Sequence, residues 1–146
     1  MCIRDSKGGG GSDVIEGGSG SDTLVGGDGD DNLDGGEDND IISPGSGANR
    51  VNGGPGTDTV IYSGDVSKEE GVVLNLSFGT CVHEGNVQDT LSSVENAYGT
   101  EYDDTLQGDD EDNVLVGQEG SDYISPGSGY DILNGGNGND TYDLEC

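Results

Sequence analysis

The chain has few of the residues from which soluble domains usually build a large core. Tryptophan is absent, phenylalanine occurs only as Phe78, and the hydrophobic fraction of the 146 residues is 28%. No apolar run approaches the roughly 20 residues of a membrane-spanning helix. Such a chain buries little apolar surface, so its composition alone favours a disordered segment.

Positive charge is also scarce. Only 4 lysines and arginines stand against 31 aspartates and glutamates, and the formal net charge is −27. Nucleic acid as a partner requires a basic surface, and an anionic membrane would repel this chain. Two interpretations remain open at this stage, a disordered acidic linker and a chain whose folding requires cations.

Cysteine and histidine give no sign of a catalytic or zinc site. The three cysteines are scattered at Cys2, Cys81 and Cys146, and an odd, scattered set does not form a disulfide framework. No Cys/His cluster with zinc-ligand spacing is present. We expect Cys81 to fill a small apolar site and His83, the only histidine, to lie in a polar loop. We therefore predict no catalytic residue in this chain.

Residues 1–7 differ from everything that follows them. The segment Met1-Cys2-Ile3-Arg4-Asp5-Ser6 resembles the translation of a transposon-end adaptor used to prepare DNA libraries, and it contains no signal-peptide core. We interpret 1–7 as a non-native leader and the chain as a fragment of a larger protein.

Glycine is abundant, with 30 copies, and it recurs with a period of nine residues. Six nonapeptides fill 8–61, and a second block of five begins at Gly99 and occupies 99–146. The shared template is G-G-x-G-x-D-x-U-x, where U is apolar. Chance would produce fewer than about one complete G-G-x-G-x-D in such a chain. Complete copies start at Gly8, Gly17, Gly26, Gly53 and Gly135.

The U position supports the same frame. It is apolar or aromatic in every unit and has polar neighbours, a pattern typical of a short strand with one inward side chain. The U residues are Ile15, Leu24, Leu33, Ile42, Val51, Val60, Leu106, Leu115, Ile124, Leu133 and Tyr142.

The other six positions of the template indicate a cation site. Glycines adopt backbone angles that side chains forbid, so a turn can bring its carbonyl oxygens together, and the sixth-position aspartate adds a carboxylate. A flexible shell of such oxygens suits Ca²⁺ better than Mg²⁺. One turn offers too few ligands. Turns n and n+2 of an 18-residue coil, stacked about 4.8 Å apart, are therefore expected to share an ion.

These units resemble the RTX (repeats-in-toxin) calcium-binding family, whose signature is this nonapeptide. The resemblance covers 8–61 and 99–143. It implies an all-β parallel β-roll that binds several Ca²⁺ ions, in a secreted, extracellular bacterial protein exported by type I secretion machinery, with cell-surface association as a variant. It also implies that backbone carbonyls near Gly8, Gly17, Gly26, Gly35, Gly117 and Gly135 bind calcium. The carboxylate ligands that it implies are Asp13, Asp22, Asp31, Asp40, Asp58, Asp104, Asp122, Asp131 and Asp140.

Some units depart from the family pattern. Asn49 and Asn113 replace the aspartate and are expected to weaken their sites, and Asp38 replaces a fourth-position glycine. The two units over 99–116 lack most turn glycines. The best sites are therefore expected within 8–40 and 117–140.

Residues 62–98 interrupt the repeat and shift its phase by one residue. The segment 72–76 is predicted to be a strand and 91–98 a second extended segment, with turns at 68–71 and 84–86. We expect a capping or connecting β element between two short rolls, with a ligand-binding loop as the alternative.

The leading hypothesis is a non-enzymatic module that folds when calcium binds and that assists secretion. One alternative is the C-terminal accessory domain of a secreted enzyme or toxin, such as a protease, lipase, epimerase or hemolysin. Another is part of a cell-surface adhesin. The sequence leaves the oligomeric state open.

Overall fold

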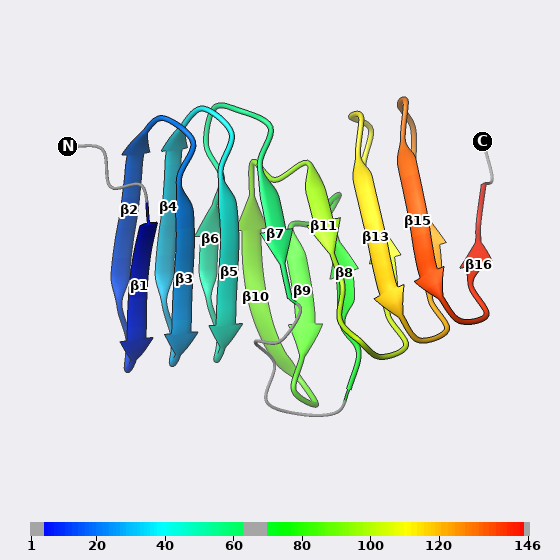
Figure 1. Cartoon of the computed structure of the whole chain (residues 1–146), viewed down its shortest axis with the longest axis horizontal. Helices are drawn as coiled ribbons and strands as arrows, with labels where there is room; N and C mark the ends of the chain where they lie inside the picture. The colour runs from blue at the N-terminus through cyan, green and yellow to red at the C-terminus, as the bar shows by residue number, and fades with distance from the viewer. Residues whose placement is uncertain (1–4, 63–69, 145–146) are drawn as a thin grey trace.

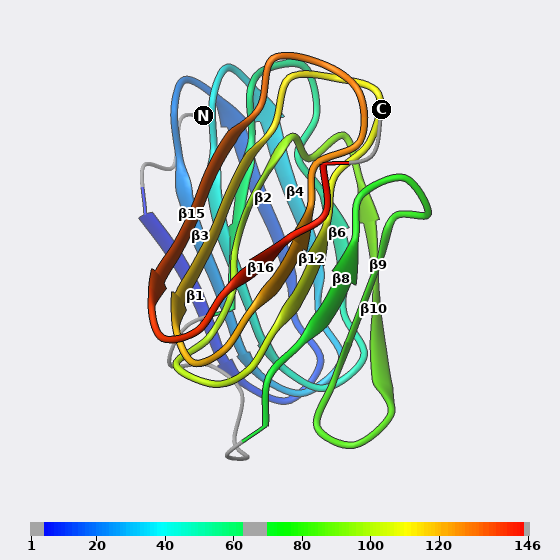
Figure 2. The same cartoon turned by 90° about the vertical axis from the view of Figure 1, so that its right-hand side faces the viewer.

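The computed structural model describes residues 5–62 and 70–144. In these residues the chain is all β, without a helix, and its strands alternate between two facing sheets. The chain winds as a β-solenoid of about seven turns, with the coils side by side along the long axis (Figures 1 and 2). The predicted all-β parallel roll is confirmed.

One of the two sheets is parallel throughout and contains seven strands. In order across this sheet they are β1 (Asp5–Gly10), β3 (Thr23–Asp28), β5 (Ile41–Ser46), β7 (Thr59–Ile61), β11 (Asn96–Tyr98), β13 (Val114–Glu119) and β15 (Ile132–Asn137).

The other sheet has nine strands, all parallel except around β9. In order they are β16 (Thr141–Tyr142), β14 (Tyr123–Ser125), β12 (Thr105–Gln107), β8 (Val73–Asn75), β9 (Thr80–His83), β10 (Val87–Ser92), β6 (Arg50–Asn52), β4 (Asn32–Glu37) and β2 (Val14–Ser19).

The strand register confirms the predicted 18-residue coil. Ile15 pairs with Leu33 across β2 and β4, and Leu24 pairs with Ile42 across β3 and β5. A shift of one residue would turn every U side chain to the solvent, so the burial of one face holds this register.

The U side chains form a narrow core between the sheets. Those of Leu24, Leu33 and Leu106 are fully buried, and each contributes roughly 1.5–3 kcal/mol through burial. Burial is weaker at the last coil, where Leu133 is partly buried and Tyr142 is 43% exposed. The remaining U residues, Ile15, Ile42, Val51, Val60, Leu115 and Ile124, are all buried.

The insert does more than join the two blocks, because its strands extend both sheets. Strand β11 lies between β7 and β13, so the seven-stranded sheet runs without a break from one block to the other. In the opposite sheet, the antiparallel meander of β8, β9 and β10 separates β12 from β6. The two blocks are therefore parts of one solenoid.

Several predictions for the insert can be compared with the structure. The strand expected at 72–76 is β8, and the turn at 84–86 is present. Strand β9 was not predicted. Of the turn expected at 68–71, residues 68 and 69 lie outside the described part of the chain, and residues 70 and 71 belong to neither a strand nor a turn.

The expectation that His83 lies in a polar loop is wrong. His83 belongs to β9 and is 2% exposed, and Cys81 on the same face is fully buried, as expected. The alternation of β9 turns both side chains inward, because successive residues of a strand face opposite sides. Residues 5–7 of the expected leader belong to β1 and pair with β3. The non-native origin of 1–7 stays a prediction.

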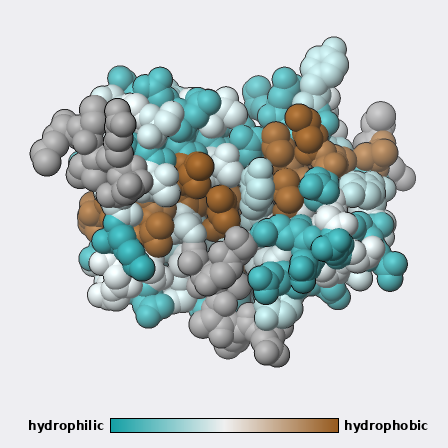
Figure 3. All heavy atoms as spheres, in the orientation of Figure 1, coloured by the Kyte–Doolittle hydropathy of each residue, from teal (hydrophilic) through white to brown (hydrophobic). Residues whose placement is uncertain are grey.

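Apolar side chains gather in patches on the face of the solenoid seen in Figure 3. Ile41 on β5 is 44% exposed, and Ile132 on β15 is 64% exposed. In the described residues, no helix has the length and apolar character needed to cross a membrane.

Candidate metal centre

The sixth-position aspartates form ladders along the edges of the solenoid. In six of them Oδ1 accepts a hydrogen bond from the backbone N–H of the equivalent residue one coil earlier, which places the carboxylate at the interface between two turns. The bonds run from Asp13 N to Asp31, Asp22 N to Asp40 and Asp40 N to Asp58 at 2.8 Å, from Asp104 N to Asp122 and Asn113 N to Asp131 at 2.9 Å, and from Asp122 N to Asp140 at 3.2 Å.

The second carboxylate oxygen of several of these aspartates is buried and has no hydrogen-bond partner. A buried charge without a partner costs several kcal/mol unless it is neutralised. Burial raises the pKa of Asp58 and of Asp122 to about 6, and it also raises the pKa of Asp31 and Asp40. The unpartnered oxygens are Oδ2 of Asp13, Asp22, Asp31, Asp40, Asp58 and Asp122.

A first-position glycine faces each of these oxygens. A Cβ atom built on Gly8 would lie 2.5 Å from Oδ2 of Asp13 and 2.5 Å from the carbonyl oxygen of Gly26, one coil further on. Calcium keeps about 2.3–2.6 Å from its oxygen ligands. The two oxygens, each 2.5 Å from one point beside Gly8, are therefore at most about 5 Å apart, close enough for one calcium ion to contact both. We call this approach of a carboxylate oxygen and a carbonyl oxygen from adjacent turns a cradle.

The same cradle recurs along both edges of the solenoid. At Gly17 it lies between Asp22 Oδ2 and the Gly35 carbonyl, and at Gly35 between Asp40 Oδ2 and the Gly53 carbonyl. The other cradles are at Gly26 (Asp31 and the Pro44 carbonyl), Gly53 (Asp58 and Ser93), Gly99 (Asp104 and Gly117) and Gly117 (Asp122 and Gly135).

The carbonyls expected as ligands lie only partly at the cradles, and their binding of calcium stays a prediction. Carbonyls of Gly26, Gly35, Gly117 and Gly135 each face a cradle, whereas Gly8 and Gly17, in the first coil, border cradles through their Cα atoms. The carbonyls of Pro44, Gly53 and Ser93 were not predicted. Among residues 5–62 and 70–144, no three His, Cys, Asp or Glu side chains converge as a metal-binding group. A cation here would therefore depend on backbone oxygens in addition to single carboxylates.

Second-position glycines allow the turns to stack this closely. Gly27 has φ +109°, a region that side chains rarely adopt, and a Cβ there would run into the Gly9 carbonyl of the preceding coil. Within the described nonapeptide turns, two residues with a side chain have positive φ, namely Gln118 at a second position (87°) and Asp38 at a fourth position (77°). Asp38 is the predicted departure from the pattern, and its Oδ2 accepts a hydrogen bond from Gly20 N at 3.2 Å.

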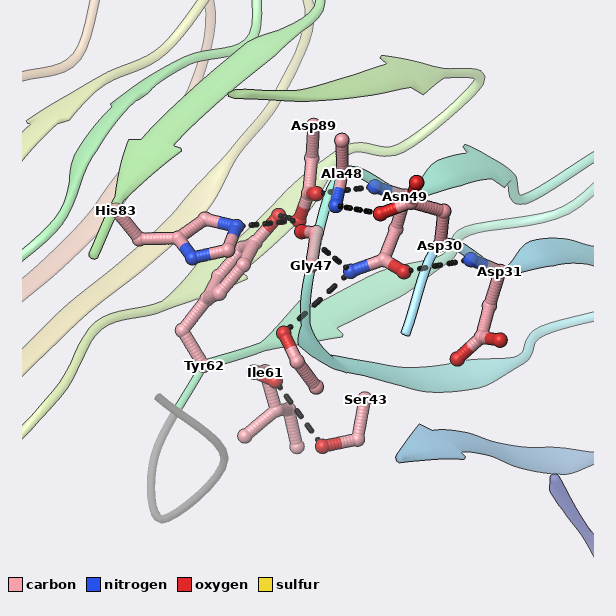
Figure 4. Close-up of polar contacts among 11 residues, drawn as sticks. Asp30, Asp31, Ser43, Gly47, Ala48, Asn49, Ile61, Tyr62, His83 and Asp89 are labelled. Atoms are coloured by element: carbon pink, nitrogen blue, oxygen red, sulfur yellow. Dashed lines mark hydrogen bonds and ion pairs between the residues drawn. The ribbon is translucent and has the colours of Figure 1, made fainter. Parts of the chain in front are cut away.

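Asn49 shows what happens when an amide replaces the carboxylate (Figure 4). Its Oδ1 accepts a hydrogen bond from Asp31 N at 2.9 Å, as the aspartates do. Its Nδ2 replaces the unpartnered Oδ2 and donates to the carbonyls of Gly47 at 3.2 Å and Gly45 at 3.4 Å. The amide thus donates to carbonyls of its own turn, which an ionised carboxylate cannot do.

Asp104 lies where it was predicted, but its two oxygens already have protein donors. Oδ2 accepts a hydrogen bond from Thr100 N at 2.6 Å, and Oδ1 accepts bonds from Val72 N at 2.7 Å and Thr100 Oγ1 at 2.9 Å. Burial still raises its pKa. At the last coil, Asp131 and Asp140 are only partly buried.

The insert contains a buried polar cluster that the sequence did not indicate. The Tyr62 hydroxyl donates to Asp89 Oδ2 at 2.7 Å, and His83 Nε2 lies 3.2 Å from the same oxygen (Figure 4). Asp89 Oδ1 accepts a hydrogen bond from Asn49 N at 2.6 Å. Burial raises the pKa of Tyr62 and of Cys81 well above their usual values. This cluster anchors the insert to the last regular turns of the first block.

A family model for the RTX calcium-binding nonapeptide repeat matches the chain in four copies, over residues 7–42, 45–65, 98–133 and 127–145. These matches cover more than half of the chain, so the chain belongs to this family of calcium-binding repeats. A comparison with curated proteins found no significant match. The family is typical of secreted bacterial proteins.

Proposed function

We propose that this chain is a calcium-dependent folding module of a secreted protein, and that Ca²⁺ ions occupy the cradles between stacked turns. The supporting observation is the contrast between aspartate and asparagine at the sixth position. The Asp40 carboxylate leaves a buried oxygen without a partner, whereas the Asn49 amide donates to the carbonyls of its own turn. A divalent cation at the aspartate turns would satisfy both carboxylate and carbonyls.

Charge explains why folding would follow calcium. The chain carries a net charge of −27, and the core consists of one apolar residue per turn. Each bound ion would neutralise two charges and link two turns, so that calcium-binding energy contributes directly to folding. Sites of extracellular modules bind calcium with Kd values of roughly 10⁻⁴–10⁻³ M. On this proposal the chain stays unfolded at cytosolic calcium and folds outside the cell.

The module acts in binding rather than in catalysis on this proposal, since its buried carboxylates face cradles and its buried histidine and cysteine pack in the insert. A protein with this property would suit export by type I secretion machinery in the unfolded state. The parent protein would be a secreted enzyme, a toxin or a cell-surface adhesin.

Circular dichroism tests the proposal. The full chain in EDTA should give a coil spectrum that converts to a β spectrum over roughly 0.1–10 mM CaCl₂ and reverts on adding chelator. The same concentrations of MgCl₂ serve as the control and should have a much smaller effect, because Mg²⁺ demands a rigid octahedral shell. A β-rich spectrum already present in EDTA would contradict the proposal.

A further inference from the structure

The first block ends in two turns that face the insert, and the two turns end differently. Turn 44–49 ends in Asn49, whose amide satisfies the carbonyls of its own turn. Turn 53–58 ends in Asp58, which is fully buried and whose Oδ2 has no hydrogen-bond partner.

The insert faces Asp58 with a short turn that lacks the nonapeptide pattern. Strands β10 and β11 continue the register of the first block, with Leu91 beside Val51 and Ala97 beside Val60. Ala97 lies six residues after Leu91, whereas their partners Val51 and Val60 are nine residues apart, so this connection is three residues shorter than a nonapeptide. Ser93 adopts φ 50°, a left-handed conformation that is uncommon for a residue with a side chain.

This short turn supplies the carbonyl oxygen of the cradle at Gly53. A Cβ atom built on Gly53 would lie 2.5 Å from Asp58 Oδ2 and would clash with the Ser93 carbonyl oxygen, so these two oxygens approach one another closely beside Gly53. These are a carboxylate oxygen and a carbonyl oxygen from adjacent coils, as at Gly8. The carbonyl, however, comes from outside the nonapeptide array.

Glu95 brings a second negative charge to the same turn. Its Oε2 accepts a hydrogen bond from Asp58 N at 2.7 Å, the bond that a sixth-position aspartate makes elsewhere. Burial, followed by the neighbouring Glu95 and Asp40 carboxylates, raises the pKa of Asp58 to about 6. A divalent cation would stabilise the ionised forms of the buried Asp58 and the half-buried Glu95 together.

The same short turn also contacts the second block. The backbone N–H of Glu95 donates to the Asp58 carbonyl at 3.2 Å, and the Glu95 carbonyl accepts a hydrogen bond from Asn113 Nδ2 at 2.9 Å. Glu95 therefore lies between the last turn of the first block and the second turn of the second.

We propose that Asp58, the Ser93 carbonyl and Glu95 form a hybrid calcium site that pins the insert to the first block and so couples the two blocks. This inference rests on the proposed calcium binding. The insert then contributes ligands to one calcium site. Because Glu95 contacts both Asp58 and Asn113, a cation bound there would affect the stability of both blocks.

The test counts bound calcium by equilibrium dialysis on the full chain at saturating CaCl₂. Gly53→Ala places a methyl group in the cradle without requiring an unusual φ, so it should lose one ion relative to the unaltered chain. Glu95→Gln should weaken the affinity for one of the ions by about tenfold, because it removes the negative charge of one ligand. Glu101→Gln removes the same charge from an exposed side chain and should change neither number nor affinity.

Hydrogen exchange read by mass spectrometry provides a second measurement. Asp58→Asn in saturating calcium should accelerate exchange of the amides in 93–99 and in β13, if the site couples the blocks. A folded Gly53→Ala protein that retains every ion would overturn the proposal. If that variant does not fold, Asp58→Asn decides in its place, and an unchanged ion count rejects the hybrid site. An unaltered chain that binds no calcium would instead refute the proposed function itself.

Discussion

The two blocks follow one nonapeptide pattern, yet they hold their carboxylates differently. In the first block, Oδ2 is buried and unpartnered at each of the five sixth-position aspartates. In the described part of the second block, this holds only for Asp122, whereas Asp104 is hydrogen-bonded through both oxygens. The same residue at the same position thus has an unpartnered buried oxygen in one turn and is fully hydrogen-bonded in another.

The second position of the turn explains this difference. Regular units have a glycine with positive φ there, such as Gly36 at 110°. Thr100 takes this position in unit 99–107 and does not have positive φ, in keeping with its β-branched side chain. Its N–H and hydroxyl both point to Asp104. At Asp104 the residue in the second position of the turn, rather than the aspartate itself, therefore determines whether the carboxylate has a protein donor.

The largest expected effect concerns the core. Leu33→Ala in the first block should lower the free energy of unfolding in saturating calcium by about 2–5 kcal/mol, because a fully buried side chain is lost. Leu133→Ala, at the partly buried last coil, should cost less than half as much. Urea titrations followed by circular dichroism measure both. Equal losses would mean that the last coil is as well packed as the centre.

The next effect tests the comparison of carboxylates directly. Asp40→Asn removes an unpartnered ligand and should weaken calcium binding in the first block by at least about tenfold. Asp104→Asn, at a carboxylate already capped by Thr100, should change calcium binding by less than about threefold. Isothermal titration calorimetry on the two variants distinguishes them, and a larger loss at Asp104 would reverse the assignment.

The response to pH should have opposite signs with and without calcium. The folded-state pKa of Asp58 and of Asp122, about 6, lies above the ordinary value of 3.8. Ionisation therefore opposes the calcium-free fold, whose stability should rise as the pH falls from 7 through 6 towards 4. Calcium binds the ionised form, so its affinity should fall over the same window, by about tenfold per pH unit below the pKa for each carboxylate.

Circular dichroism in EDTA and calcium titrations at pH 7 and pH 5 measure these two trends. Asp58→Asn and Asp122→Asn should each flatten both of them, one variant for each block. An EDTA spectrum that gains no β structure between pH 7 and pH 4 would contradict the expected sign.

The smallest effect concerns backbone strain. Asp38→Gly relieves a positive φ of 77° and removes one charge, but it also removes the acceptor for Gly20 N. We expect a net gain of no more than about 1 kcal/mol in unfolding free energy. Asp30→Gly is the matched control, because Asp30 also accepts a backbone N–H bond one coil away but is not among the residues with positive φ. The control should be destabilising.

Much of the fold could be predicted from local pattern. The U residues, the 18-residue coil and the parallel strands followed from a nonapeptide that repeats, because one apolar residue per turn can be buried only if turns stack. The positions of the sixth-position aspartates followed in the same way. The insert could not be predicted to this depth, since its pairings join segments that share no repeat, such as β8 with β12.

The sequence by itself determined the solenoid, its register and the residue type that faces each cradle, because these depend on periodic spacing alone. Only the tertiary structure decided which of these carboxylates lack a protein hydrogen-bond donor. Asp58 and Asp104 occupy equivalent positions of the template, but one faces the bare carbonyl of Ser93 and the other the donors of Thr100. The physical reason is that the neighbours of a buried charge come from adjacent coils, and in this chain an irregular insert supplies some of them.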